Sequence, residues 1–143
     1  MGLFDFYKPA PRINDPVFGT MVYNNGFASA NVPSPQRGKE TEVLVECGSN
    51  GPTGNQHAFF RQVIDGYQAL SQKCSEAIAM EFRNSKEDFA ISSFDDEFEL
   101  VAISIPSSDD QEWSLAFTTE LDQNHHFTVH LLGREPTNVL IDG

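Results

Sequence analysis

The sequence predicts an α+β fold: a mostly antiparallel sheet of about six to seven strands with one long helix packed on one face. Three observations predict it. Short β-type runs fill the first third of the chain, one long run of helical periodicity follows, and four further β-type runs joined by turn-rich segments complete it. The length of 143 residues fits one core. We therefore expect residues 1–143 to form a single domain, with residues 1–14 as an N-terminal arm.

The first residues lack the features of an export signal. Leu3, Phe4 and Phe6 form an apolar patch that Asp5 interrupts, and no apolar run of about 7–15 residues follows. A stretch of about 20 apolar residues, as a membrane-spanning helix needs, occurs nowhere in the sequence. We expect a cytoplasmic protein whose N-terminal arm docks on the domain or on a partner.

Three strands are predicted before the helix. Two β-type runs, Val17–Tyr23 and Phe27–Val32, flank the sequence Asn-Asn-Gly at Asn24–Gly26, which is favoured in tight turns because Asn and Gly accept positive φ. This pattern predicts a β-hairpin. The third strand is predicted over Glu40–Cys47, where apolar and polar residues alternate so that one face is expected to be wet.

A long helix is predicted after the glycine-rich segment Gly48–Asn55. That segment lacks the Gly-Lys-Ser/Thr ending of a phosphate-binding loop, so it does not predict nucleotide binding. Thr53 and Gln56 instead fit a capping box. Apolar residues then recur at spacings of three and four to about Arg83. A break or bend is expected near Gly66, because glycine in a helix interior costs about 1 kcal/mol relative to alanine.

Four more strands are predicted after a polar stretch around Asn84–Ser93. Segments rich in turn residues separate them. The first is apolar on both faces from Leu100 to Ile103, which is typical of a central strand. The predicted strands are Phe98–Ile105, Glu112–Glu120, His126–Leu132 and Thr137–Ile141.

The two cysteines do not indicate a redox or nucleophilic site. Cys47 and Cys74 lack the CxxC spacing of redox and metal motifs, and we expect both to be buried thiols, with a bridge between them left open. A Cys-His-Asp arrangement could be assembled from the residue types present, but no local signature supports one. No catalytic residue is predicted.

The histidines and the paired acids are equally weak as catalytic or metal-binding signals. His126 and His130 would share one face of a strand roughly 13 Å apart, too far to hold one ion, and they are expected on its wetter face. His57 is expected to be a surface residue in the first turn of the helix. Neighbours such as Asp95 and Asp96 point apart in extended chain and cannot share a proton. The sequence predicts no metal and no cofactor.

Negative charge is the most distinctive property of the chain. The formal net charge is −12, and between Ser85 and Glu112 nine acidic residues accompany the single basic residue Lys86. The candidate partner-binding residues fall into a first acidic group, Asp95, Asp96, Glu97 and Glu99, and a second acidic group, Asp109, Asp110 and Glu112. Because these groups largely precede and follow one predicted strand, they are expected at its opposite ends and need not form one patch.

Two interpretations of this charge stay open. The acids form a solvated face that keeps the protein soluble, or they create a field that steers a basic partner toward the surface. Direct binding to nucleic acid is disfavoured, because affinity for phosphates comes chiefly from Lys and Arg. A protein that binds a nuclease fits better, since an acidic inhibitor can occupy the basic groove that otherwise takes phosphates.

Three segments carry a family resemblance. They are D-P-V-F-G-T-M-V-Y at Asp15–Tyr23, G-P-T-G-N-Q-H-A-F-F at Gly51–Phe60, and H-F-T-V-H-L-L-G at His126–Gly133. They resemble a family of small bacterial domains of unknown function that is similar to the immunity proteins of contact-dependent growth inhibition and related polymorphic-toxin systems. The segments are a strand opening, a helix cap and a terminal strand. The resemblance therefore implies a fold more than a role, and it implies no catalytic residue.

Charge and resemblance together lead to a functional hypothesis. We expect a non-catalytic cytoplasmic immunity protein that binds and neutralises a cognate bacterial toxin domain, a basic nuclease, as a monomer in a 1:1 complex. The alternatives are a housekeeping protein-interaction module of unknown partner and, less favoured, a small enzyme. Neither a membrane nor nucleic acid is expected as a direct partner.

Overall fold

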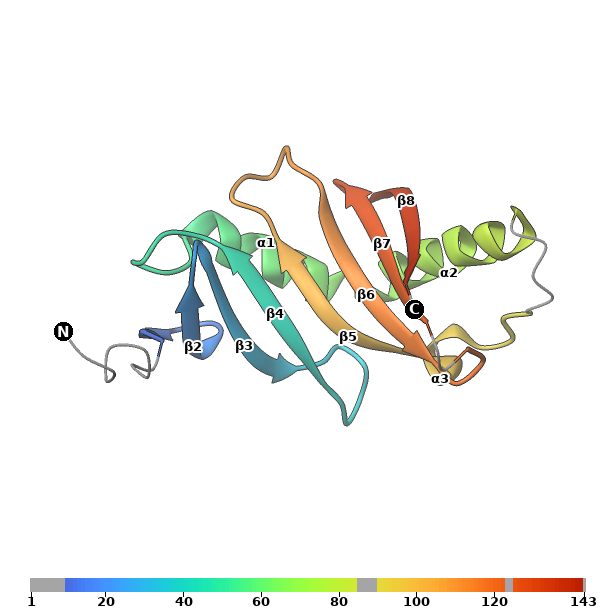
Figure 1. Cartoon of the computed structure of the whole chain (residues 1–143), viewed down its shortest axis with the longest axis horizontal. Coiled ribbons are helices and arrows are strands. Elements are labelled where there is room, and N and C mark those ends of the chain that lie inside the picture. Colours follow the sequence, from blue (N-terminus) through green and yellow to red (C-terminus); the bar gives the residue numbers. More distant parts are fainter. Residues whose placement is uncertain (1–9, 85–89, 123–124, 143) are drawn as a thin grey trace, which may run out of the picture.

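The computed structural model describes residues 10–84, 90–122 and 125–142, which form one sheet with helices on one face (Figure 1). The strands are β1 (Arg12–Asp15), β2 (Gly19–Asn24), β3 (Phe27–Pro33), β4 (Glu40–Glu46), β5 (Phe98–Ile105), β6 (Trp113–Thr119), β7 (His126–Leu132) and β8 (Glu135–Asp142). The helices are α1 (Gly54–Asp65), α2 (Tyr67–Asn84) and α3 (Phe94–Glu97). The predicted α+β class is confirmed.

The strands lie in the sheet in sequence order, from β1 to β8. All neighbouring pairs are antiparallel except β4 and β5, which run parallel. Two antiparallel halves of four strands therefore meet at one parallel pair. The helices lie in the connection between β4 and β5, because parallel neighbours require a crossover. In Figure 1, α1 lies behind the middle of the sheet and α2 extends behind and beyond β8.

The sheet has one strand more than the six to seven expected, and that strand is β1. The predicted N-terminal arm over residues 1–14 falls mostly outside the described residues, including Leu3, Phe4 and Phe6. Its last residues, Arg12–Asn14, pair with β2 at the edge of the sheet. Since β1 contains a single apolar residue, Ile13, hydrophobic alternation could not identify it.

The predicted hairpin is confirmed as β2 and β3. Asn25 and Gly26 have φ values of 50° and 88°, the positive values that a two-residue turn of type I′ requires at both positions. In β4, the face that carries Val43 and Val45 is fully buried, while Glu42 is exposed on the opposite face. The helices cover the first of these faces.

The predicted helix is divided at Gly66, as its sequence indicated. α1 ends at Asp65 and α2 begins at Tyr67, and the N–H group of Gly66 donates to the carbonyl of Gln62 at 2.9 Å. The division lets α1 pack against β5 while α2 packs against β7 and β8. No helix in the described ranges is long and apolar enough to cross a membrane.

Five phenylalanines join α2, α3 and the sheet into one core. Phe127 of β7 contacts Phe82 of α2 and Phe98 of β5, with ring centroids 5.5 Å and 5.7 Å apart. Phe98 stacks on Phe94 of α3 at 4.7 Å, and Phe94 also contacts Phe117 of β6 at 5.0 Å. These contacts hold α3, a single turn that the sequence did not predict, against the end of the sheet.

The predicted capping box at the start of α1 is also confirmed. Thr53 Oγ1 accepts a hydrogen bond from the N–H of Gln56 at 3.2 Å, and Gln56 Oε1 accepts one from the N–H of Thr53 at 3.0 Å. Gln56 Nε2 also donates to the carbonyls of Glu46 at 2.6 Å and Pro106 at 2.9 Å. The helix start is thereby tied to the ends of β4 and β5.

The capping box predicts a graded loss of stability. Thr53→Ala is expected to lower the free energy of unfolding by about 1 kcal/mol, the usual cost of a lost N-cap. Gln56→Ala is expected to cost about 2–3 kcal/mol, because three backbone groups lose a partner. Urea unfolding followed by circular dichroism measures both, and Thr53→Ser, which keeps the hydroxyl, serves as the control. Alanine variants as stable as Thr53→Ser would contradict this role.

Candidate functional site

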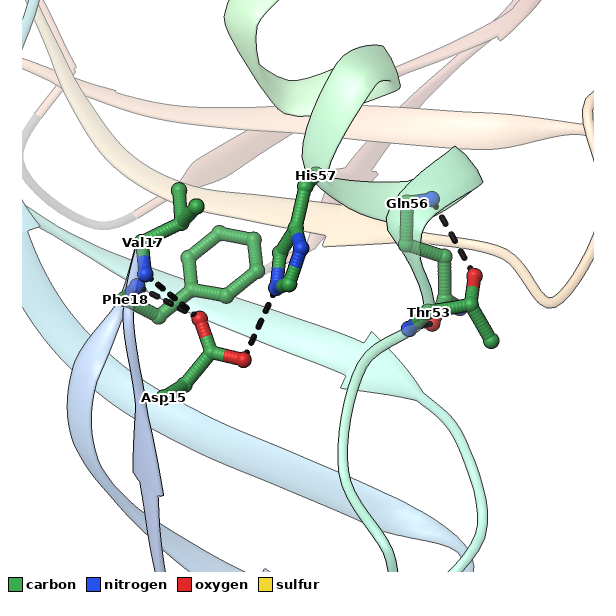
Figure 2. Close-up of polar contacts among 6 residues, drawn as sticks. All are labelled: Asp15, Val17, Phe18, Thr53, Gln56 and His57. Carbon is green, nitrogen blue, oxygen red and sulfur yellow. Dashed lines mark hydrogen bonds and ion pairs between the residues drawn. The ribbon is translucent and has the colours of Figure 1, made fainter.

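A pair formed by the buried Asp15 and the half-buried His57 links the edge of the sheet to α1. Asp15 Oδ2 accepts hydrogen bonds from the backbone N–H groups of Val17 at 2.9 Å and Phe18 at 2.8 Å, and Asp15 Oδ1 lies 2.8 Å from His57 Nε2. Figure 2 shows the carboxylate between the β1–β2 turn and the first turn of α1. The prediction of a surface His57 is wrong: its side chain is 16% exposed, because it packs beside the Phe18 ring and pairs with Asp15.

The surroundings of Asp15 favour its ionised form. Burial alone would raise its pKa, but the hydrogen bonds from Phe18, His57 and Val17 together outweigh burial and hold the pKa below its ordinary value. Each of these contacts joins Asp15 to another group of the same chain. Neither Asp15 nor His57 lines either of the two clefts described below. The pair is best explained as a structural clamp that fixes β1 and β2 on α1.

The clamp predicts a dependence of stability on pH. Because the folded-state pKa of Asp15 lies below the value of 3.8 for a free side chain, its stabilising effect is full above that value and is lost as pH falls through the folded-state pKa. Asp15→Asn removes this titration. Urea unfolding below about pH 5 should therefore show a steeper loss of stability for the natural protein than for Asp15→Asn. Parallel curves would contradict the lowered pKa.

The two thiols are not activated. Both are free; Cys74 is fully buried in α2 and Cys47 is half-buried at the end of β4. Burial raises the pKa of Cys47, and it raises the pKa of Cys74 to about 12. Nucleophilic cysteines have the opposite shift, since the thiolate is the reactive form. In the part of the chain that the structure describes, no three His, Cys, Asp or Glu side chains gather closely enough to hold a metal ion.

The expected placement of the strand histidines is confirmed. Phe127, Val129 and Leu131 of β7 are fully buried on the helix side of the sheet. His126 is exposed and His130 is half-buried on the opposite face.

An acidic cleft opens at the end of the sheet where α3 lies. Its volume is about 990 Å³, and its walls come from the β3–β4 loop, the α1–α2 junction, α3 with the start of β5, and the end of β6. Six of the eight charged residues that line it are acidic. The acids are Asp65, Asp95, Asp96, Glu97, Glu99 and Glu120, and the bases are Arg37 and Lys39. We call this site the acidic cleft.

The structure thus brings all of the first acidic group into the acidic cleft, although its members differ in what they contact. Glu97 Oε1 accepts hydrogen bonds from the N–H groups of Ser92 at 2.6 Å and Ser93 at 2.5 Å, so this carboxylate holds the start of α3. Glu99 forms an exposed ion pair with Lys39 at 3.0 Å. Asp95 and Asp96 are exposed on α3.

Two acids of the cleft, Asp65 and Glu120, were not predicted to belong to it. Asp65 is the last residue of α1 and Glu120 directly follows β6. Neither belongs to a dense acidic run, and only the packing of the helices on the sheet brings them beside α3. Position is their one local signal: Asp65 directly precedes the break expected at Gly66, and Glu120 is the last residue of the predicted strand Glu112–Glu120.

The second acidic group lies at the opposite end of β5, in the loop before β6 (Figure 1). The length of β5 separates the groups by roughly 25 Å, at about 3.3 Å per residue. Asp109 and Asp110 are exposed, and Glu112 Oε2 accepts a hydrogen bond from Thr137 Oγ1 at 2.6 Å. Glu112 also lines a smaller cleft of about 420 Å³. The two groups therefore do not form one patch.

Tyr67, the first residue of α2, completes the wall of the acidic cleft. The residue is 6% exposed, and its hydroxyl has no hydrogen-bond partner among the described residues. Burial raises the pKa of Tyr67 far above its ordinary value, and the negative charge of Asp95 adds to the shift. The hydroxyl is therefore neutral over the physiological range.

Comparison with known proteins adds no relative to these observations. No protein-family model matches the chain, and no curated protein or solved structure matches it significantly. The resemblance to small immunity-type domains stays a prediction from the three sequence segments.

Proposed function

We propose that the protein is a non-catalytic cytoplasmic binding protein that neutralises a basic protein partner: an immunity protein for a cognate bacterial toxin domain with nuclease activity. The observation that carries this proposal is the acidic cleft, in which acids from α1, α3, β5 and the end of β6 surround one hollow. Residues far apart in the sequence therefore place negative charge around one cleft.

A cleft of one charge sign is suited to capture an oppositely charged surface. Low-dielectric walls focus the field of the acids outward, which raises the rate of encounter with a basic protein and disfavours acidic ones. The net charge of −12 strengthens this field at distances up to a Debye length of about 8 Å at physiological salt. The groove with which a nuclease holds phosphates would present the complementary charge.

The remaining polar groups support binding rather than catalysis. The Asp15–His57 pair is engaged in joining β1 and β2 to α1. Burial keeps the thiols of Cys47 and Cys74 protonated at neutral pH. Four of the six acids of the cleft, Asp65, Asp95, Asp96 and Glu120, are exposed, so a protein partner can contact them directly.

Co-expression tests the proposal. Cells that produce the toxin domain encoded immediately upstream are expected to grow when this chain is produced as well, and the two proteins should purify as a 1:1 complex. An unrelated acidic protein of similar size serves as the control for charge alone. Continued cell death despite soluble chain would contradict the proposal and would favour a housekeeping interaction module with another partner.

A further inference from the structure

The acidic cleft contains a polar group that has no partner within the described part of the free protein. The Tyr67 side chain lies in the wall of the cleft and its hydroxyl makes no hydrogen bond to any described residue. A buried hydroxyl without a partner loses its bonds to water and gains nothing in return. A phenylalanine would fill the same space without this cost. The hydroxyl therefore lowers the stability of the free protein, unless a group of another molecule forms a hydrogen bond with it.

We propose that the acidic cleft takes a basic side chain of the protein partner, an arginine or lysine whose N–H donates a hydrogen bond to Tyr67 Oη while Asp95 and its neighbours balance the charge. This inference rests on the proposed function, because it names the group of the partner that enters the site. Two independent features favour a cationic side chain in this site. The acids balance a positive charge, and the neutral hydroxyl of Tyr67 accepts a hydrogen bond.

The geometry of the cleft fits a long cationic side chain. Tyr67 is buried at the α1–α2 junction, whereas Asp95 and Asp96 are exposed on α3 at the rim. The hydroxyl oxygen is closed to solvent in the free protein, so the side chains around it must shift before a donor reaches it. An arginine or lysine suits such a buried acceptor, because it carries its donors at the end of a long apolar stem. The volume of about 990 Å³ leaves room for the neighbouring residues of the partner.

The two basic residues of the cleft itself do not take the place of the partner's arginine or lysine. Lys39 is held by Glu99 at 3.0 Å in an exposed pair. Arg37 is exposed in the β3–β4 loop at the rim. Neither base donates to Tyr67 Oη.

A peptide titration with the full chain tests the inference without any toxin. The probe is an acetylated, amidated arginine tetrapeptide, and the matched control is the same peptide made of citrulline, which has nearly the same shape and no charge. Nuclear magnetic resonance titration is expected to show saturable shifts at residues of the cleft for the arginine peptide, and an affinity at least about tenfold weaker for citrulline. Equal binding of both peptides, or no binding of the arginine peptide, would overturn the inference.

Tyr67→Phe isolates the hydroxyl. The variant is expected to bind the arginine peptide about tenfold more weakly, as loss of a hydrogen bond to a charged group predicts, while its melting temperature stays unchanged or rises. Tyr23→Phe, on β2 and outside the cleft, is the control and should change neither quantity. A tyrosine that served only the fold would show the reverse: lower stability and unchanged affinity.

The outcomes separate this inference from the proposed function. If Tyr67→Phe binds the peptide as well as the natural protein does, the hydroxyl is not part of the site and the inference fails, whatever co-expression shows. If cells die despite co-expression but the peptide binds with the expected dependence on Tyr67, the cleft is a cation site and the immunity role alone fails.

Discussion

Replacing Phe127 by alanine is expected to lower the free energy of unfolding by about 3–5 kcal/mol. The side chain is fully buried and touches Phe82 of α2 and Phe98 of β5, so its loss opens a cavity where a helix meets the sheet. For a domain of this size the melting temperature should fall by about 10 °C or more. Thermal and urea unfolding measure the two quantities.

Two controls make the result specific. Phe127→Leu keeps most of the volume and should lose less than half as much stability. Leu140→Ala shortens an exposed side chain on neighbouring β8 and should change stability by less than about 0.5 kcal/mol. A loss for Phe127→Ala no larger than that of Leu140→Ala would mean that α2 does not pack on β7 as described.

Neutralising three acids of the cleft is expected to weaken binding to a basic toxin domain by roughly tenfold or more. The variant combines Asp95→Asn, Asp96→Asn and Glu120→Gln. Single exposed charges contribute about 0–1 kcal/mol each, so the combined change is needed for a clear effect. Glu97 is kept because its carboxylate accepts backbone hydrogen bonds at the start of α3, and Glu99 because it pairs with Lys39. Titration calorimetry with the purified toxin domain measures the affinity.

The second acidic group provides a control of equal charge. Asp109→Asn, Asp110→Asn and Glu112→Gln also remove three charges, but roughly 25 Å from the cleft, at about 3.3 Å per residue of β5. This variant should bind within about threefold of the natural protein, because screening at physiological salt removes most of the field at that distance. Equal losses in both variants would indicate that net charge matters and that the cleft does not.

The features predicted from sequence are those whose causes are local. Positive φ at Asn25 and Gly26 follows from the residues in the turn itself, and the cap at Thr53 needs only Gln56 three residues later. The division at Gly66 likewise reflects one residue. Alternation along β4, β6 and β7 was read correctly because one face is buried and the other is not.

The features that escaped prediction depend on contacts between distant segments. β1 forms because β2 offers it an edge and Asp15 anchors it, although its own sequence is polar. A bulge at Val101 lets Leu100 and Ile103 face the core together, which period-two alternation cannot foresee. α3 is held by its stacking on Phe98 and not by its helix propensity.

The candidate site was predicted in part. The first acidic group was identified from its density in the sequence, and the separation of the two groups followed from their positions around one strand. The cleft itself could not be foreseen, because Asp65 and Tyr67 reach α3 only through the packing of both helices on the sheet. The Asp15–His57 clamp joins residues 42 positions apart and carries no motif that would reveal it.

The most direct test of the acidic cleft as the binding site is the association rate constant with the purified toxin domain, measured by stopped flow at increasing salt. For the natural protein and the second-group variant, the rate constant should fall steeply with ionic strength, because rim charges act mainly on encounter. For the cleft variant, the association rate constant should be lower at low salt and should decrease less as the ionic strength rises. Three proteins with the same rate constants and the same salt dependence would contradict the account.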